Sequence, residues 1–194
     1  MRKQKGFSLI ELLIVVAIIL IIAAIAIPNL MRARIAANES SAVGSIRNVI
    51  TQEIAYQSTY QAQGYAPNII NLGPPNGQAA CAPGFVPTSV SACLVDGALS
   101  GADPTEGGAA TKSGYGFESL GSNPTPGGAN QSFTAAAVPV TFNQSGTRDF
   151  CAIEDGVVRG NLPAAGNTGG FAGAGALAGG GSAVCTAAPF AALQ

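Results

Sequence analysis

Few side chains in this sequence could carry nucleophilic or metal chemistry. The 194-residue chain has no histidine, which excludes Ser-His-Asp and Cys-His catalysis and histidine-ligated metal sites. Its four cysteines, Cys81, Cys93, Cys151 and Cys185, lack the CxxC spacing of zinc sites and favour disulfides. Of the three possible pairings, we favour Cys81–Cys93, which closes a Pro-rich loop, and Cys151–Cys185, which ties a Gly-rich tail to a predicted strand.

A group of three carboxylates is the second candidate for chemistry. Asp149, Glu154 and Asp155 could bind Ca²⁺, or they could form a solvated turn that Arg148 and Arg159 neutralise. We favour the turn, because Ca²⁺ takes about six to eight oxygen ligands and Gly-rich loops would have to supply the others. Nothing suggests the sugar cleft that a pair of glycosidase carboxylates would need. We therefore predict that the chain is not an enzyme and holds no metal or other cofactor.

Composition divides the chain into two parts. Residues 1–61 hold two of the 26 glycines and one of the 12 prolines, and residues 62–194 hold all others together with the four cysteines. This contrast predicts a continuous helix followed by a turn-rich domain. The net charge of −1, with only 10% charged residues, argues against nucleic-acid binding, which needs clustered Lys and Arg.

The N-terminus has the pattern of a membrane anchor. Residues 1–6 carry three positive charges, and residues 9–27 are apolar except for Glu11. This length is close to the ~20 residues that cross a bilayer as a helix, with the basic end in the cytoplasm. A secretory signal peptide is the alternative. It is disfavoured because the apolar run is long and no small-x-small cleavage site follows it.

The helical pattern continues beyond the apolar run. Val43, Ile46, Ile50 and Ile54 fall on one helical stripe, which predicts a single helix from about residue 7 to about residue 60. Its exposed half must pack on the turn-rich domain. The side chains expected to form polar surface around the stripe are Arg32, Arg34, Glu39, Arg47 and Glu53.

Short strand signals lie in the second part. Alternation around residues 115–117 and 133–142 predicts strands, with Pro139 at an edge strand or a bulge. Residues 148–159 predict a hairpin whose turn is Asp155-Gly156. The fold class is therefore α+β: a long N-terminal helix packed against a small antiparallel sheet of three or four strands. Residues 164–183, almost entirely Gly and Ala, predict a C-terminal surface loop.

One motif carries a family resemblance. Residues 5–18, KGFSLIELLIVVAI, resemble the class III signal of type IV pilins and type II secretion pseudopilins. The short basic leader, the Gly6-Phe7 junction, Glu11 four residues after Phe7, and Pro28 all match. The resemblance covers about the first 60 residues, and beyond them it is architectural only.

This resemblance implies a maturation and a location. A prepilin peptidase of the inner membrane would cut after Gly6 and N-methylate the new amine of Phe7. Residues 1–6 would be the leader and 7–61 the helix, whose residues 7–28 first anchor the precursor in the inner membrane with a cytoplasmic N-terminus. Residues 62–194 would form the periplasmic, later extracellular, domain. A turn-rich domain carrying disulfides is consistent with such a compartment.

The resemblance also assigns two residues. Glu11 would pair with the Phe7 amine of a neighbouring subunit and set the docking depth, since a buried charge left alone is strongly unfavourable. The alternative is that Glu11 pairs with its own chain's amine or with lipid headgroups. Pro28 has no backbone N–H to complete a helical hydrogen bond, so it predicts a kink at the membrane surface. The resemblance adds the expectation that the helix melts locally near Pro28 inside a filament.

The function implied is that of a structural subunit of a type IV pilus, a major one, for adhesion, twitching motility or DNA uptake. Its expected partners are copies of itself, the prepilin peptidase, an inner-membrane platform protein with assembly and retraction ATPases, and an outer-membrane secretin. Two alternatives remain. A type II secretion pseudopilin would build a periplasmic pseudopilus, and a membrane-tethered binding or enzymatic module would stay uncut and monomeric.

Overall fold

The computed structural model describes residues 8–75, 78, 80–101, 110–161, 185–186 and 190–193. The predicted leader, the Gly6-Phe7 junction and the Gly/Ala segment 164–183 lie outside these residues. The chain divides into two compact units, residues 1–34 and residues 35–194. The long helix α1 contributes to both of them.

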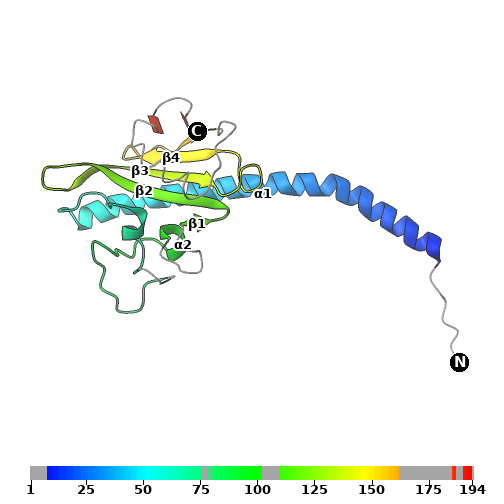
Figure 1. The fold of residues 1–194 in the computed structure, drawn as a ribbon, viewed down its shortest axis with the longest axis horizontal. Helices are drawn as coiled ribbons and strands as arrows, with labels where there is room; N and C mark the ends of the chain where they lie inside the picture. The colour runs from blue at the N-terminus through cyan, green and yellow to red at the C-terminus, as the bar shows by residue number, and fades with distance from the viewer. Residues whose placement is uncertain are drawn as a thin grey trace. The chain divides into compact units, whose positions relative to one another are not determined.

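Helix α1 spans Leu9–Thr59, 51 residues, and confirms the single long helix predicted from the sequence (Figure 1). It runs through Pro28 without interruption in its helical assignment. Among the described residues, α1 is the helix that is long and apolar enough to cross a membrane.

The buried stripe of α1 differs from the predicted one. Ile46 and Ile50 are buried, but Ile54 is 52% exposed. Glu53, which we expected on the polar surface, is fully buried. Around a helix of 3.6 residues per turn, Glu53 lies about 20° from Ile46, whereas Ile54 lies about 80° from it. The complete buried set is Glu39, Ala42, Ser45, Ile46, Val49, Ile50, Glu53 and Tyr56.

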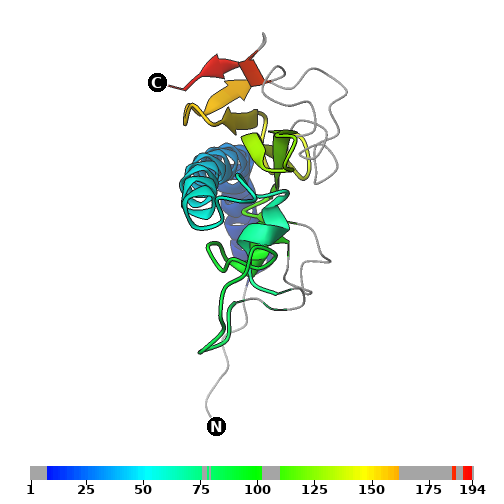
Figure 2. The ribbon, with the colours of Figure 1, turned by 90° about the vertical axis from the view of Figure 1, so that its left-hand side faces the viewer.

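The sheet is antiparallel throughout and has the order β1-β2-β3-β4-β5-β6. Its strands are β1 (Thr111–Lys112), β2 (Tyr115–Pro124), β3 (Asn130–Pro139), β4 (Asp149–Ile153), β5 (Arg159–Asn161) and β6 (Ala191–Ala192). Six strands replace the predicted three or four, because β1 and β6 have only two residues each and no alternating pattern. Figure 2 shows β5 and β6, in orange and red, continuing the sheet beyond β4.

The prediction for Pro139 was wrong. β3 is a central strand, paired with β2 on one side and β4 on the other. Pro139 is its last residue, and β4 pairs only with residues 134–137. The nitrogen of Pro139, which carries no hydrogen, therefore lies beyond the end of β4, so no hydrogen bond between β3 and β4 is lost.

The hairpin of β4 and β5 exists, but its turn is longer than predicted. Cys151 pairs with Arg159, so residues 154–158 make the connection rather than Asp155-Gly156 alone. The Gly156 N–H donates to the carbonyl of Ile153 at 3.0 Å, and Gly156 has a φ of +73°. This left-handed glycine closes the turn three residues after Ile153, and Val157 and Val158 follow before pairing resumes.

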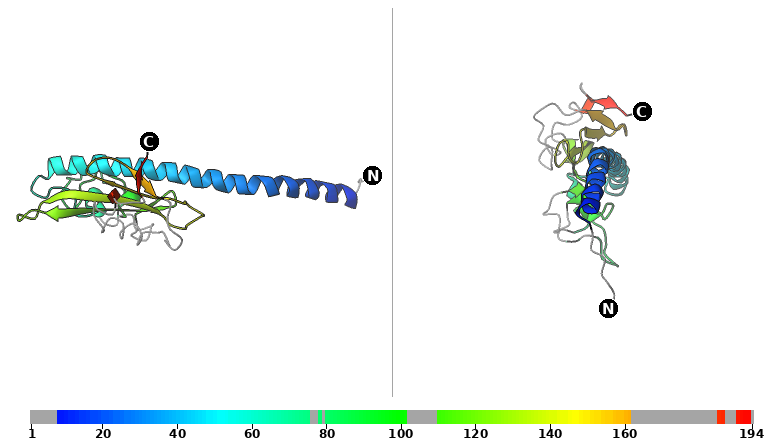
Figure 3. Two further views of the ribbon diagram at one scale, coloured as in Figure 1. Left: turned by 90° about the horizontal axis from the view of Figure 1, so that it is seen from above. Right: turned by 90° about the vertical axis from the view of Figure 1, so that its right-hand side faces the viewer.

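The core of the second unit lies between the later part of α1 and one face of the sheet. Figure 3 shows this part of α1, in cyan, running alongside β2 and β3. Ile46, Val49 and Tyr56 of α1 share one buried cluster with Phe117 of β2 and Phe133 of β3. Two short helices, η1 (Ile69–Leu72) and α2 (Gly97–Ser100), add Leu72 and Leu99 to the same cluster.

Both disulfides form the pairs that we favoured from the sequence. Cys81 is bonded to Cys93, with Cα atoms 6.1 Å apart. Cys151 of β4 is bonded to Cys185, with Cα atoms 5.8 Å apart. Cys151 and Cys185 are buried with Ile153 and pack against Phe190, just before β6. The second disulfide therefore fixes the C-terminal residues to the sheet.

Candidate functional site

The surface of α1 in residues 9–31 is apolar and exposed. In its most apolar 18-residue window, no residue is buried inside the structure. The exposed large side chains are Leu9, Ile10, Leu12, Leu13, Ile14, Val15, Val16, Ile18, Ile19, Leu20, Ile21, Ile22, Ile25, Ile27, Leu30 and Met31. A continuous apolar surface of this size marks contact with a membrane or another protein.

Glu11 lies at the N-terminal end of this surface. Its Oε2 accepts a hydrogen bond from the backbone N–H of Ser8 at 3.0 Å. The first turn of a helix has free N–H groups and the positive end of the dipole, both of which favour a carboxylate. Glu11 therefore contacts its own chain at Ser8. Phe7, the residue before Ser8, lies outside the described residues.

Arg32 and Arg34 follow the apolar run within the first unit and are exposed. Long basic side chains at the end of an apolar helix can reach the polar headgroup layer while their stems stay against lipid. These two residues therefore form a polar boundary at the C-terminal end of the apolar surface, and Glu11 lies at its N-terminal end.

The second unit contains a buried ionic cluster around Glu39. Its Oε2 accepts hydrogen bonds from Nε and Nη2 of Arg148, at 2.9 and 2.7 Å. Its Oε1 accepts from the backbone N–H and the hydroxyl of Thr147, at 3.0 and 2.8 Å. Burial raises the pKa of Glu39, but the bonds from Thr147 and Arg148 outweigh it and hold that pKa below its ordinary value. The cluster joins α1 to the β3–β4 connection.

A second buried carboxyl lies 14 residues further along α1. Glu53 Oε1 accepts a hydrogen bond from the hydroxyl of Ser119 on β2 at 2.7 Å. Its Oε2 accepts from the backbone N–H of Ala66 at 2.9 Å. Burial raises the pKa of Glu53 to about 7, because these two hydrogen bonds lower it by less.

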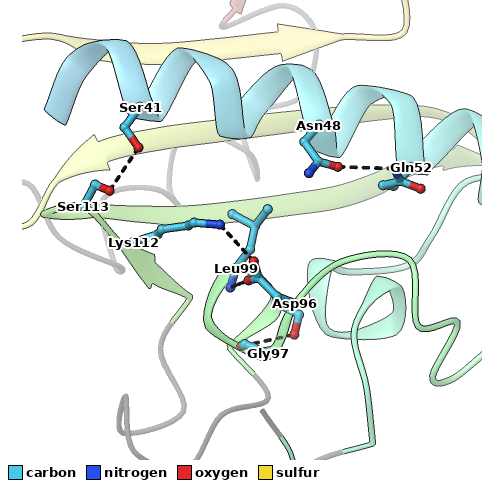
Figure 4. A network of polar contacts seen from close by, with 9 residues as sticks. Ser41, Asn48, Gln52, Asp96, Gly97, Leu99, Lys112 and Ser113 are labelled. Carbon is cyan, nitrogen blue, oxygen red and sulfur yellow. Dashed lines mark hydrogen bonds and ion pairs between the residues drawn. The ribbon is translucent and has the colours of Figure 1, made fainter. Parts of the chain in front are cut away.

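A polar network joins the loops beside β1 (Figure 4). Asp96 accepts hydrogen bonds from the backbone N–H of Leu99 at 2.7 Å and from Lys112 Nζ at 2.8 Å. The Ser41 hydroxyl of α1 donates to the Ser113 hydroxyl at 3.0 Å. These contacts hold α2 and the β1–β2 turn in place.

The carboxylates of the hairpin do not form one site. Asp149 is buried in β4, whereas Glu154 and Asp155 are exposed in the connection to β5. Arg159 pairs with Asp155, but Arg148 pairs with Glu39 rather than with the hairpin. The solvated-turn interpretation thus fits Glu154 and Asp155 and is wrong for Asp149. Within the part of the chain that the structure describes, no three acidic or cysteine side chains could hold a metal ion.

Sequence reasoning missed the buried roles of Glu39 and Glu53. Both were assigned to polar surface because they are charged. The available signal was their spacing, since they lie 3 residues before Ala42 and 3 before Tyr56, in line with the buried Ile46 and Val49. A charged residue in line with an apolar stripe predicts a paired or protonated carboxyl.

Comparison with known proteins bears on the N-terminal region. Residues 1–27 match the family described as the prokaryotic N-terminal methylation motif. The type IV wide pilus major component of Thermus thermophilus is 49% identical over 57 residues, 29% of this chain and 44% of that protein. The type IV major pilin protein of Myxococcus xanthus is 37% identical over 75 residues, 39% of this chain and 34% of that protein. No solved structure matches the chain.

The match spans less than half the length of both relatives. Their names describe pilus subunits rather than enzymes, in agreement with the prediction that this chain is not an enzyme. The α+β fold, with an apolar N-terminal helix and an antiparallel sheet, is consistent with that of the type IV pilins. The motif and both relatives together show that the N-terminal region of this chain is similar to that of type IV pilins.

Proposed function

We propose that this chain is the structural subunit of a type IV pilus and polymerises through its N-terminal helix. The observation that supports this most is the exposed apolar surface of residues 9–31, with a single carboxylate at its N-terminal end. Such a helix is stable away from water in two settings, because its backbone hydrogen bonds are satisfied internally. One setting is the bilayer, and the other is the interior of a filament of identical helices.

Maturation begins on the cytoplasmic side in this proposal. The prepilin peptidase cuts between Gly6 and Phe7, and the leader takes Arg2, Lys3 and Lys5 with it. The new Phe7 amine is N-methylated. Removing the basic leader is necessary because three positive charges at the start of an apolar helix would otherwise enter the filament interior.

Docking depends on Glu11. Its carboxylate pairs with the Phe7 amine of a neighbouring subunit, so the charge is compensated at one depth of insertion only. The hydrogen bond from Ser8 is made within the chain and holds the carboxylate at the N-terminal end of the helix, where the neighbouring amine would have to replace or join it. Pro28 supplies a weak point where the helix can loosen as the filament is stretched.

The filament then requires further components. A platform protein with assembly and retraction ATPases extracts subunits from the inner membrane, and an outer-membrane secretin passes the fibre outward. The pilus serves adhesion, twitching motility or DNA uptake. The named relatives support a major subunit, since both are described as major components.

Imaging under native expression separates this proposal from its two alternatives. The proposal predicts surface fibres that bind an antibody to this chain and disappear when its gene is deleted. A pseudopilin would leave the label in the periplasm, and a tethered binding module would leave it in the membrane as a monomer. Either of these label distributions would contradict the pilus proposal.

A further inference from the structure

Glu53 lies at a junction of three segments in the second unit. Its carboxyl connects α1 to residue 66, just after the helix, through the Ala66 N–H at 2.9 Å. It also connects α1 to β2 through the Ser119 hydroxyl at 2.7 Å. Both Glu53 and Ser119 are completely buried. The end of α1 is therefore joined to the sheet through one carboxyl group.

No cation compensates this carboxyl in the described part of the chain. The three ion pairs found there involve Asp96, Glu39 and Asp155 instead. The titratable groups that interact with Glu53 are Tyr56 on α1 and Tyr65 after it. Burial is the main cause that raises the pKa of both tyrosines, and Glu53 adds to the rise. Both tyrosines are uncharged near neutral pH.

The remaining nearby acids are not among the groups that shift the pKa of Glu53, although burial raises the pKa of Glu118 as well. Glu154, in the β4–β5 connection, interacts with Tyr65 rather than with Glu53 directly. Glu118 precedes Ser119 on β2, and adjacent strand residues point to opposite faces, so Glu118 lies on the other side of the sheet. A buried carboxylate with two donors and no cation is costly, and such a group binds a proton instead.

We propose that Glu53 is a proton-dependent latch that holds the end of α1 to residue 66 and β2 when protonated and weakens this junction when ionised. The inference concerns the second unit and does not depend on the pilus proposal. When protonated, Glu53 carries its proton on Oε1 and donates it to Ser119 Oγ, while Oε2 still accepts from Ala66. When ionised, the proton leaves to solvent, and the Ser119 hydroxyl turns to donate.

The direction of the pH effect follows from burial. The pKa of Glu53 is raised from 4.5 to about 7, so the folded chain binds the proton more tightly than the unfolded chain. The contribution of Glu53 to stability is highest below about pH 4.5, falls as pH rises toward about 7, and then levels off. Each pKa unit is tenfold in the folding equilibrium constant, so the fall is on the order of a hundredfold.

The test compares the full chain in detergent micelles with its Glu53→Gln variant by denaturant unfolding between pH 5 and pH 8. Glutamine keeps both contacts, since Oε1 accepts from Ala66 and Nε2 donates to Ser119. The near-ultraviolet circular dichroism of tyrosine follows unfolding near the latch, because there are four tyrosines and no tryptophan. We expect the wild-type folding constant to fall roughly a hundredfold over this range and the variant to lose most of that fall.

Two controls complete the experiment. Glu154→Gln, at an exposed acid of the same unit, is expected to keep the wild-type pH dependence. Ser119→Ala removes the acceptor of the protonated form and the donor of the ionised form. Because the bond to the charged form is the stronger one, the transition is expected to shift to higher pH, which tests the latch even if Glu53→Gln fails to fold. An unchanged pH dependence in Glu53→Gln, or no upward shift in Ser119→Ala, would overturn the inference. So would a wild-type infrared spectrum without a protonated carboxyl band that titrates near neutral pH.

Discussion

At the scale of single residues, α1 contains two buried glutamates in opposite electrostatic states. Glu39 is surrounded by the Arg148 guanidinium and two donors of Thr147, so its ionised form is favoured. Glu53 has two neutral donors, so its protonated form is favoured at moderately acidic pH. The difference arises from the partners that the sheet and its loops bring to the helix.

Replacing Glu39 with glutamine should destabilise the second unit. The glutamine amide would place an N–H donor against the N–H donors of the Arg148 guanidinium. The loss in unfolding free energy is about 1–3 kcal/mol, because Arg148 is partly exposed. The pKa of Glu39 is depressed, so its contribution is present above about pH 4.5 and is lost as pH falls through the lower folded value. Denaturant unfolding should show acid sensitivity below pH 4.5 that is weaker in Glu39→Gln. Equal stability of the two proteins at pH 7 would refute this.

Replacing Glu11 with alanine should block docking without blocking insertion. A costly charge leaves the apolar run, so membrane insertion survives, and Gly6 is untouched, so leader cleavage survives. Fibre yield should fall sharply because the neighbouring amine enters the filament unpaired. Glu11→Lys should be worse, since it brings two positive charges together. The measurement compares processed subunit in membranes with subunit in sheared fibres, and normal fibre yield in Glu11→Ala would favour the own-chain or headgroup pairing.

At the scale of elements, the sequence predicted what depends on local pattern. The limits of α1 and the existence of the β2, β3 and β4 strands followed from apolar periodicity and composition. β1 and β6 were not predictable, because two-residue strands arise from backbone pairing with a neighbour and leave no side-chain pattern. The partners of Glu39 and Glu53 were not predictable either, since Thr147, Arg148 and Ser119 come from 66 to 109 residues away in the sequence.

Gly44 is a weak point of α1 that can be strengthened. It is exposed, and a Cβ built there meets nothing within 4 Å. Gly44→Ala should raise stability by about 0.5–1 kcal/mol, the difference between glycine and alanine within a helix. Gly146→Ala is the opposite control, because its Cβ would lie 2.0 Å from the hydroxyl oxygen of the buried Tyr115. In thermal unfolding, the Tm should rise in Gly44→Ala and fall in Gly146→Ala. A lower Tm in Gly44→Ala would contradict the account.

The Cys151–Cys185 disulfide holds the C-terminal residues on the sheet. It spans 34 residues, and chain entropy gives about 3–4 kcal/mol for closing such a loop. Replacing both cysteines with serine should release β6 from β5 and make the C-terminal residues more sensitive to protease. Limited proteolysis with non-reducing peptide mapping checks this. Mapping should also join Cys81 to Cys93 in both proteins, and protease resistance equal to wild type would count against the anchoring role.

At the scale of the whole molecule, one helix serves two units of different character. Residues 9–31 offer an apolar surface for a membrane or a filament, and residues 39–56 bury their inner face against the sheet. The N-terminal role that we propose was predictable because a short basic segment, a Gly6-Phe7 junction and one carboxylate in an apolar run form a local motif. Nothing local in the sequence specifies which surfaces of residues 35–194 meet neighbouring subunits, because such surfaces come from tertiary structure.

The most direct measurement is the mass and N-terminal sequence of this chain in fibres sheared from cells under native expression. Our account predicts a subunit that begins at N-methyl-Phe7, because the peptidase removes residues 1–6 and leaves the apolar run intact for assembly. The same measurement on the membrane fraction provides the precursor for comparison. A fibre subunit that begins after residue 28, or a chain that keeps Met1 and occurs in no fibre, would contradict the account.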